Sequence, residues 1–316
     1  MIEQHPVTDD AKLHPLRRFD VTGSVVPALP RFDKHPRLTP LGLYTRKRWP
    51  DLEIPERGNK VTERGTILEP AVAVAARMQR PHWKIAAANT YYRDPDLRFG
   101  ATPDFLVDDN GLRGVLQAKT VARHVYEREW LDGTEVPTWI LLQTLAEAML
   151  TEAAFAAVAV MVVDPFDLET TIFDVPRHPV VERSIRQGVA EFWDDVAHDR
   201  EPTPDYSRDD AVIRLLHPSE TKGKTLDLSG NNELPELLAH RAALAARIKR
   251  DQGICDAIES QVRHMMGDAE SANGLDGWRI SYKTSHRSAY TVPEKDIRTL
   301  RITDKRPAEQ RPDMET

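Results

Sequence analysis

The pattern of apolar and polar residues along the chain predicts a mixed sheet flanked by helices. Apolar residues recur at helical spacing in residues 66–79 and 138–151, and short apolar runs such as 155–163 indicate buried strands. The order of helix, three strands, helix and strand predicts an α/β (α+β) fold with helices packed on a mixed central β-sheet. The expected helices cover residues 41–49, 66–79, 138–151 and 180–197, and the expected strands cover 84–92, 103–107, 112–121, 155–163 and 170–175.

The predicted core occupies residues 36–200, and the remaining segments are expected to lie outside it. Residues 1–35 are rich in Pro, His and Arg without periodicity, so an irregular N-terminal arm is predicted. The proline-containing segment 201–205 predicts a boundary, which is followed by a C-terminal extension over residues 206–316.

The C-terminal extension carries a heptad pattern of apolar residues, which predicts one long amphipathic helix at about 233–266. Arg241 and Asp251 interrupt this pattern. The apolar stripe suits packing within the chain or against another subunit. Alternation of residues further along predicts a β-hairpin at about 277–293.

Composition indicates an ordinary globular protein that does not enter a membrane. Of the 316 residues, 40% are apolar and 29% are charged, and the net charge is −7. The most apolar run, residues 153–163, is too short to cross a bilayer, which takes about 20 residues. Cys255 is the only cysteine, so no intrachain disulfide can form. Because no secretion signal is recognisable either, we expect a cytoplasmic protein.

Positive charge is concentrated ahead of the predicted central strands. Residues 37–64 carry seven basic and four acidic side chains, which leaves this segment at +3. Nucleic-acid binding depends on the local distribution of charge rather than on the net value. Arg46, Lys47 and Arg48 form a basic cluster in this segment, which suits either a solvated helix end or a phosphate clamp; the family resemblance given below implies contacts to a DNA end here.

The candidate chemistry lies on two adjacent predicted strands. Pro103 and Asp104 begin an apolar run, and residues 108–111, Asp-Asp-Asn-Gly, predict a tight hairpin turn because Asn-Gly accepts positive φ. On the returning strand, Gln117 and Lys119 share one face because side chains alternate. A carboxylate, an amide oxygen and an ammonium group aimed at one point suit Mg²⁺-assisted attack on a phosphodiester.

These motifs resemble the YqaJ-like viral recombinase family, which comprises phage-type exonucleases of the PD-(D/E)XK nuclease superfamily. The resemblance implies a restriction-endonuclease-like core and a Mg²⁺-dependent exonuclease, with Mn²⁺ as a substitute, that digests duplex DNA from an end in the 5′ to 3′ direction. It also implies a homo-oligomer, a single-strand annealing protein as a partner, and the cytoplasm of a bacterial host cell. The matching residues are Gly65, Glu69, Gly100-Ala101-Thr102-Pro103-Asp104, Gln117-Ala118-Lys119 and Gln143.

The resemblance further implies a set of metal ligands. Asp104, the side-chain oxygen of Gln117 and the backbone carbonyl of Ala118 would bind Mg²⁺, an ion that prefers oxygen ligands. Glu69 would hold a metal-bound water or a second ion. Thr66 and Glu69 also fit a capping box, which is the alternative role for this glutamate.

Two further residues would act directly on the reacting groups. Lys119 would orient the attacking water and offset charge on the phosphate. Gln143 would hydrogen-bond the nucleophile or the terminal phosphate, with Glu147 one turn later on the same helix face. A buried polar residue in mid-helix needs a partner, so a structural role for Gln143 is the alternative.

Gln117 departs from the pattern of this family, which most often has Glu at the corresponding position. An amide oxygen can bind Mg²⁺ but brings no negative charge, so the affinity for the ion should fall. Two other functions therefore stay open: an endonuclease with the same core, and a catalytically silent protein that binds DNA ends or adapts a recombination complex.

Overall fold

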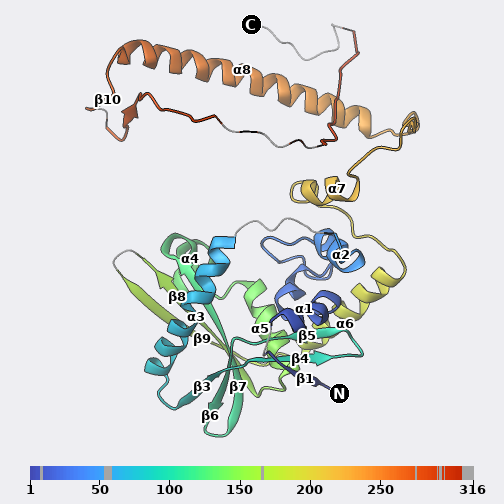
Figure 1. Cartoon of the computed structure of the whole chain (residues 1–316), viewed down its shortest axis with the longest axis vertical. Coiled ribbons are helices and arrows are strands. Elements are labelled where there is room, and N and C mark those ends of the chain that lie inside the picture. Colours follow the sequence, from blue (N-terminus) through green and yellow to red (C-terminus); the bar gives the residue numbers. More distant parts are fainter. Residues whose placement is uncertain are drawn as a thin grey trace. The chain divides into compact units, whose positions relative to one another are not determined.

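The computed structural model describes residues 1–7, 10–52, 59–164, 167–274, 276–289, 291, 294 and 296–307 (Figure 1). Contacts divide the chain into unit 1, Met1–Leu216, and unit 2, His217–Thr316, so the division falls after the segment 201–205. No helix in the described ranges has both the length and the apolar character that crossing a membrane requires.

Unit 1 is built on a five-stranded sheet with the order β3-β6-β7-β8-β9. Strands β7 and β8 are parallel, and the other neighbouring pairs are antiparallel, so the predicted mixed sheet is confirmed. Asn110 and Gly111 both have positive φ and form the turn between β6 and β7, as the Asn-Gly pattern predicts. The bounds of the strands are β3 Trp83–Ala87, β6 Phe105–Asp109, β7 Leu112–Ala122, β8 Phe155–Val163 and β9 Leu168–Val175.

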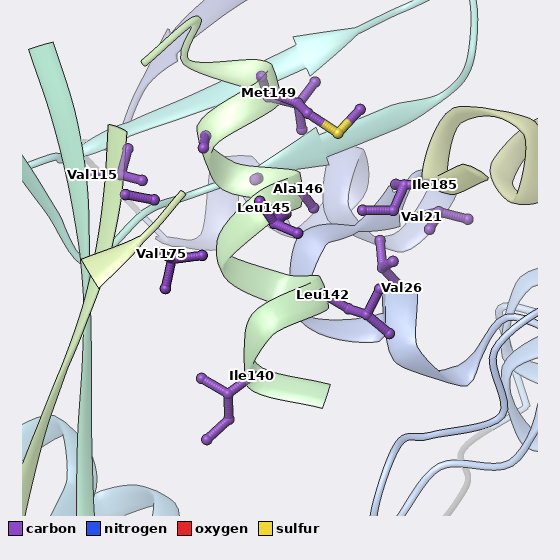
Figure 2. Packing of buried hydrophobic residues seen from close by; sticks show 14 of the residues in the cluster. Val21, Val26, Val115, Ile140, Leu142, Leu145, Ala146, Met149, Val175 and Ile185 are labelled. Carbon is purple, nitrogen blue, oxygen red and sulfur yellow. The ribbon is translucent and has the colours of Figure 1, made fainter. Parts of the chain in front are cut away.

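Two long helices cover the opposite faces of this sheet. Alternate residues of β8 face α3 (Asn59–Gln79) on one side and α5 (Thr138–Leu150) on the other, as the two separate core clusters show. Figure 2 shows the cluster around α5, where Val115 of β7 lies beside α5 residues such as Leu145. Leu116, the next residue of β7, belongs to the α3 side. Odd-numbered residues of β7 therefore face α5.

The helices predicted near 41–49, 138–151 and 180–197 are confirmed as α2 (Pro40–Arg48), α5 and α6 (Pro179–Ala197). Helix α2 begins as its sequence requires, because the Thr39 hydroxyl accepts a hydrogen bond from Gly42 N at 2.9 Å and Pro40 occupies the first turn. Three short helical elements of unit 1 lie further along the chain: α4 (Arg123–Glu129), η2 (Leu131–Gly133) and α7 (Asp210–Leu216).

Helix α3 begins earlier than predicted, at Asn59 rather than near residue 66. Thr66 lies inside the helix and donates its hydroxyl to Thr62 O at 3.3 Å, so the capping-box alternative for Glu69 is wrong. The buried side of α3 carries Val72, Ala73 and Ala76.

The N-terminal segment, predicted to be irregular, instead supplies structure to unit 1. It forms β1 (Glu3–Pro6), α1 (Asp10–Phe19), β2 (Val21–Thr22) and η1 (Gly23–Ala28). The strands β1 and β2 have only four and two residues, too few for periodicity to reveal them, and pairing with other strands holds them. Val21, Val26 and Leu29 are fully buried in the α5-side core.

A second sheet joins this segment to the core, with the order β1-β4-β5-β2. Its other strands are β4 (Thr90–Asp94) and β5 (Phe99–Ala101). The strand predicted over 84–92 is thus two strands, β3 and β4, which belong to different sheets. The extended conformation is interrupted between the two strands at Asn89, which takes a positive φ.

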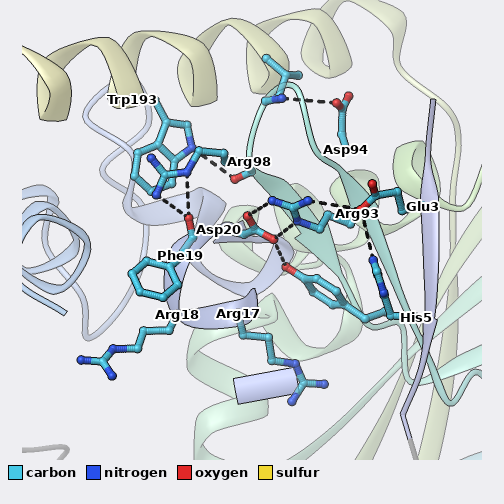
Figure 3. A network of polar contacts seen from close by, with 12 residues as sticks. Glu3, His5, Arg17, Arg18, Phe19, Asp20, Arg93, Asp94, Arg98 and Trp193 are labelled. Atoms are coloured by element: carbon cyan, nitrogen blue, oxygen red, sulfur yellow. Dashed lines mark hydrogen bonds and ion pairs between the residues drawn. The ribbon is translucent and has the colours of Figure 1, made fainter. Parts of the chain in front are cut away.

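A buried carboxylate holds the second sheet against the N-terminal segment (Figure 3). Asp20 is fully buried and accepts hydrogen bonds from Arg93 Nε at 2.7 Å and from Tyr91 Oη at 3.0 Å. Removing one partner of such a pair leaves an uncompensated buried group and costs about 3–5 kcal/mol.

In unit 2 the predicted long helix is confirmed as α8 (Leu234–Met266). The hairpin predicted at about 277–293 is wrong in position, because β10 (Ser271–Ala272) pairs with β11 (Ile280–Ser281). The first strand of this pair begins a few residues after the end of α8, where Gly267 has a positive φ and terminates the helix. Residues 290, 292 and 293 of the predicted hairpin lie outside the described ranges.

We expect Gly100→Ala to destabilise the protein by about 1–3 kcal/mol. A Cβ at residue 100 would lie 2.1 Å from Tyr91 Oη, so the buried ring must move away from Asp20. Urea unfolding followed by circular dichroism measures the change. Gly65→Ala is the matched control, because nothing lies within 4 Å of its added Cβ in α3 and the helix should gain about 1 kcal/mol. Equal stability of wild type and Gly100→Ala would contradict the close packing.

Candidate active site

Asp104 directly precedes β6, and the adjacent strand β7 fixes its carboxylate. Phe105 pairs with Leu116 across the strands, so Asp104 comes next to Gln117. Asp104 Oδ2 accepts hydrogen bonds from Ala118 N at 2.8 Å and from Gln117 Nε2. Burial raises the pKa of Asp104, while Lys119 acts in the opposite direction.

Gln117 and Lys119 share the face of β7 that is turned toward α5, and Gln143 of α5 meets both of them. Gln143 Nε2 donates to Gln117 Oε1 at 3.1 Å, and Lys119 Nζ donates to Gln143 Oε1 at 3.3 Å. The Lys119 ammonium also lies 5.5 Å from the centre of the Trp139 ring. A continuous chain of hydrogen bonds therefore runs from Asp104 to the lysine.

Glu147 extends this chain one turn further along α5. Gln143 Nε2 donates to Glu147 Oε1 at 2.9 Å, and the carboxyl group is only 2% exposed. Its second oxygen, Oε2, is buried without a hydrogen-bond partner. Burial is the main cause that raises the pKa of Glu147 to about 8, with repulsion from Asp104 second.

Glu69 reaches the same group of charges from α3. Burial raises the pKa of Glu69 to about 7, the charge of Asp104 adds to this rise, and Lys119 opposes it. The structure therefore brings Glu69, Asp104 and Lys119 within electrostatic range although they come from different elements. Because α3 and β6 are far apart in the sequence, it is the tertiary fold that brings these three side chains together.

A cavity of about 230 Å³ adjoins the buried end of this hydrogen-bond chain. Arg17 lies in its wall and donates from Nη2 to Thr102 Oγ1 at 3.0 Å. Arg17 and Ser24 were not predicted as site residues because they belong to the segment predicted to be irregular. The only sequence signal for Arg17 was the arginine content of that segment. The cavity is lined by Arg17, Thr22, Gly23, Ser24, Tyr91, Ala101, Thr102, Gln143 and Glu147.

The basic side chains of α2 that were predicted to contact phosphates interact with other groups of the chain. Lys47 Nζ donates to the backbone oxygens of Arg17 and Arg18 at 3.0 and 3.2 Å. Burial lowers the pKa of Lys47 to about 8. Arg48 Nε donates to Asp199 Oδ1 at 2.7 Å, and Arg46 also has an interaction within the chain. Lys47 therefore fixes the end of α1, which positions Arg17 in the cavity wall.

The donor set has the composition of a Mg²⁺ site that relies on few carboxylates. Among the described residues, no three His, Cys, Asp or Glu side chains are grouped closely enough to hold a metal ion. Mg²⁺ is commonly held by one or two carboxylates together with water and substrate phosphates, and Asp104 and Glu69 fit this requirement. Gln117 turns its amide nitrogen toward Asp104, so binding through Oε1 requires rotation of its amide.

One of the comparisons with known proteins supports the fold. No protein-family model matches the chain, and no curated protein matches it. The alkaline exonuclease LHK-Exo from Laribacter hongkongensis is similar over 60% of this chain and 94% of its own, with a TM-score of 0.50 and 17% identity. Its complex with dAMP is similar over the same shares, with a TM-score of 0.48 and 18% identity. A phage-related exonuclease from Haemophilus somnus 129PT covers 59% of this chain and 99% of its own, with a TM-score of 0.41 and 12% identity.

The first of these similarities shows a shared fold. Unit 1 has the mixed sheet flanked by helices of that nuclease, so the predicted restriction-endonuclease-like fold class is confirmed.

We expect Glu147→Gln to flatten the dependence of stability on pH. The pKa of Glu147 rises from 4.5 to about 8 on folding, so folding favours the protonated carboxyl. Its contribution to stability is complete below the unfolded pKa and is lost as the pH rises through about 8, on the order of a few kcal/mol. A glutamine stays uncharged, so the variant should exceed wild type in stability at pH 9.

Urea unfolding in EDTA at pH 5, 7 and 9 measures this difference. Glu127→Gln, which removes an exposed carboxylate, is the matched control and should keep the wild-type slope. Parallel curves for wild type and Glu147→Gln would show that Glu147 does not titrate as its burial indicates.

Proposed function

We propose that this protein is a metal-dependent deoxyribonuclease that hydrolyses phosphodiester bonds of duplex DNA from an end. The observation that carries the proposal is the convergence of Asp104, Gln117 and Lys119 on one face of two paired strands, held there by Gln143. The fold shared with an alkaline exonuclease adds support.

The residues of the site divide into ion ligands and groups that act on the substrate. Asp104, Glu69, the carbonyl of Ala118 and, after rotation of its amide, Gln117 would hold Mg²⁺. Such an ion supplies Lewis-acid stabilisation of the charge on a phosphoryl oxygen. Lys119 orients water for attack and offsets the negative charge that develops on the phosphate.

The cavity beside the site supports action at a DNA end. Arg17 and the hydroxyl groups of Ser24 and Thr102 are suitable donors to a terminal phosphate. Gln143 lines this cavity and also contacts Lys119, so it connects the end-binding pocket with the reacting groups. We therefore favour an exonuclease. The same proposal includes, from the family resemblance, digestion in the 5′ to 3′ direction, a homo-oligomeric state, a role in recombination and an annealing partner.

A catalytically silent DNA-end-binding protein is the second candidate, and one observation favours it. The Gln117 amide nitrogen donates to Asp104, which satisfies this carboxylate without an ion. Incubation with linear and closed-circular duplex DNA, in Mg²⁺ or in EDTA, separates the functions. Loss of linear DNA alone indicates an exonuclease, and loss of both forms indicates an endonuclease. Retained end binding without loss of either form indicates the silent protein.

We expect Asp104→Ala and Lys119→Ala each to lower the rate of digestion by at least about 10²-fold. The first removes the central carboxylate, and the second removes the cation beside the reacting phosphate. Release of acid-soluble nucleotides from linear duplex measures the rate, and thermal unfolding checks that each variant is folded. Lys84→Ala, on an exposed lysine of β3, should keep the wild-type rate. Wild-type turnover in either site variant would remove the basis for the assignment.

We expect Gln117→Glu to strengthen ion binding and to lower the stability of the folded protein in the absence of the ion. The new carboxylate would lie against Asp104, where two like charges repel each other until a cation joins them. The Mg²⁺ concentration for half-maximal digestion should therefore fall. The melting temperature should fall in EDTA and should rise more steeply with Mg²⁺ than that of wild type.

Isothermal titration with Mg²⁺ or Mn²⁺ gives a readout that does not require activity. Gln261→Glu, on an exposed position of α8, adds the same charge away from the site and should change neither property. An unchanged affinity in Gln117→Glu would argue that residue 117 does not contact the ion.

A further inference from the structure

Helix α8 carries an exposed apolar stripe along residues 237–255. Leu237, Leu244 and Ile248 are 61%, 46% and 67% exposed, and Cys255 is exposed as well. Their heptad spacing places them on one side of the helix. Ala246, which is buried, lies on the opposite side. The stripe is therefore a face that the described part of unit 2 leaves uncovered.

Beyond residue 255, α8 receives cover from its own unit. Met266 is buried, and Ile258 and Val262 line a cavity of about 360 Å³ together with Ile280 and Tyr282 from the β11 region. Residues 237–255 are thus the part of the stripe that precedes this contact, whereas Ile258 and Met265 beyond it are 56% and 73% exposed.

Two charged residues within the stripe determine how a second helix can lie on it. Arg241 and Asp251 occupy positions where apolar side chains would continue the pattern. In a parallel, in-register pair, each would face the same residue of the partner, which places like charges opposite each other. In an antiparallel pair centred on residue 246, Arg241 faces Asp251 of the partner subunit. The same register places Leu244 against Ile248 of the partner subunit.

We propose that a second copy of this chain pairs with α8 in this antiparallel register, through residues 237–255. The apolar layers supply the burial, and the charged layers fix the register, which is the best-attested use of polar residues in such seams. Asp251 is accessible for this contact, since its ion pair within α8 is to Arg247 at 3.7 Å and both side chains are largely exposed. Because both copies use the same surface, the pairing closes as a dimer. It gives a surface to the homo-oligomeric state of the proposed function, and its tests do not use nuclease activity, so the two can fail separately.

Cross-linking in the full-length protein tests the register, because the antiparallel pair places Leu237 opposite Cys255 of the partner subunit. Within one helix these positions are about 27 Å apart, at about 1.5 Å per residue, whereas a disulfide needs Cα atoms within about 7 Å. Mild oxidation of Leu237→Cys should therefore yield a covalent dimer on a non-reducing gel. Cys255 is the only natural cysteine, so wild type serves as one control and Leu237→Cys/Cys255→Ser as the other.

Both controls should stay monomeric on the gel, because like positions lie about 27 Å apart in the antiparallel pair. A Cys255–Cys255 dimer in wild type would indicate a parallel pair and would overturn the proposal. Absence of the cross-link in Leu237→Cys, which is expected if another part of the chain or another protein covers the stripe, would overturn it as well.

Charge reversal provides an independent test of the pairing between Arg241 and Asp251. Arg241→Asp should weaken self-association at least about 10-fold in sedimentation equilibrium, because two carboxylates then face each other. The double variant Arg241→Asp/Asp251→Arg restores opposite charges in the antiparallel register and should recover most of the affinity. Circular dichroism checks that α8 stays helical in each variant. Failure of the double variant to recover, with helicity intact, would contradict the register.

Discussion

Strand β7 is hydrogen-bonded on both sides, antiparallel to β6 and parallel to β8, and this double pairing fixes where its side chains point. Leu116 is locked into the core beneath α3, so Gln117 and Lys119 must face α5. A shift of one residue in the register would turn the lysine toward the apolar core beneath α3 and move the leucine to the α5 side. The same hydrophobic burial that stabilises the sheet therefore also assembles the site.

The site places three carboxyl groups beside the ammonium group of Lys119. Burial raises the pKa values of Asp104, Glu69 and Glu147, and the positive charge of Lys119 opposes the rise at all three. Buried carboxyl groups with one nearby ammonium stay neutral by taking up protons or accept a metal ion. The chemistry proposed for the site therefore depends on whether Asp104, Glu69 and Glu147 are protonated.

The sequence predicted those parts of the fold whose signals are local. The apolar run of β8, the Asn110-Gly111 turn and the helix α5 each carry their own pattern, so their positions were found within a few residues. The N-terminal elements were missed because strands of two to four residues depend on their partners rather than on periodicity. For the same reason Arg17, which is brought to the site by tertiary packing, was not predicted.

Gln117 is the residue at which the needs of stability and chemistry conflict. A carboxylate here would stand beside Asp104 in a buried site that already holds Glu147 at the far end of Gln143. The amide instead donates to Asp104 with its nitrogen and accepts from Gln143 with its oxygen, so both of its polar ends are satisfied without an ion. Glutamine therefore stabilises the folded protein without an ion, and under the proposed function it would offer Mg²⁺ one negative charge fewer than glutamate. Because Gln143 joins residue 117 to both Lys119 and Glu147, rotation of the Gln117 amide toward an ion must also rearrange the hydrogen bonds of the lysine and the buried acid.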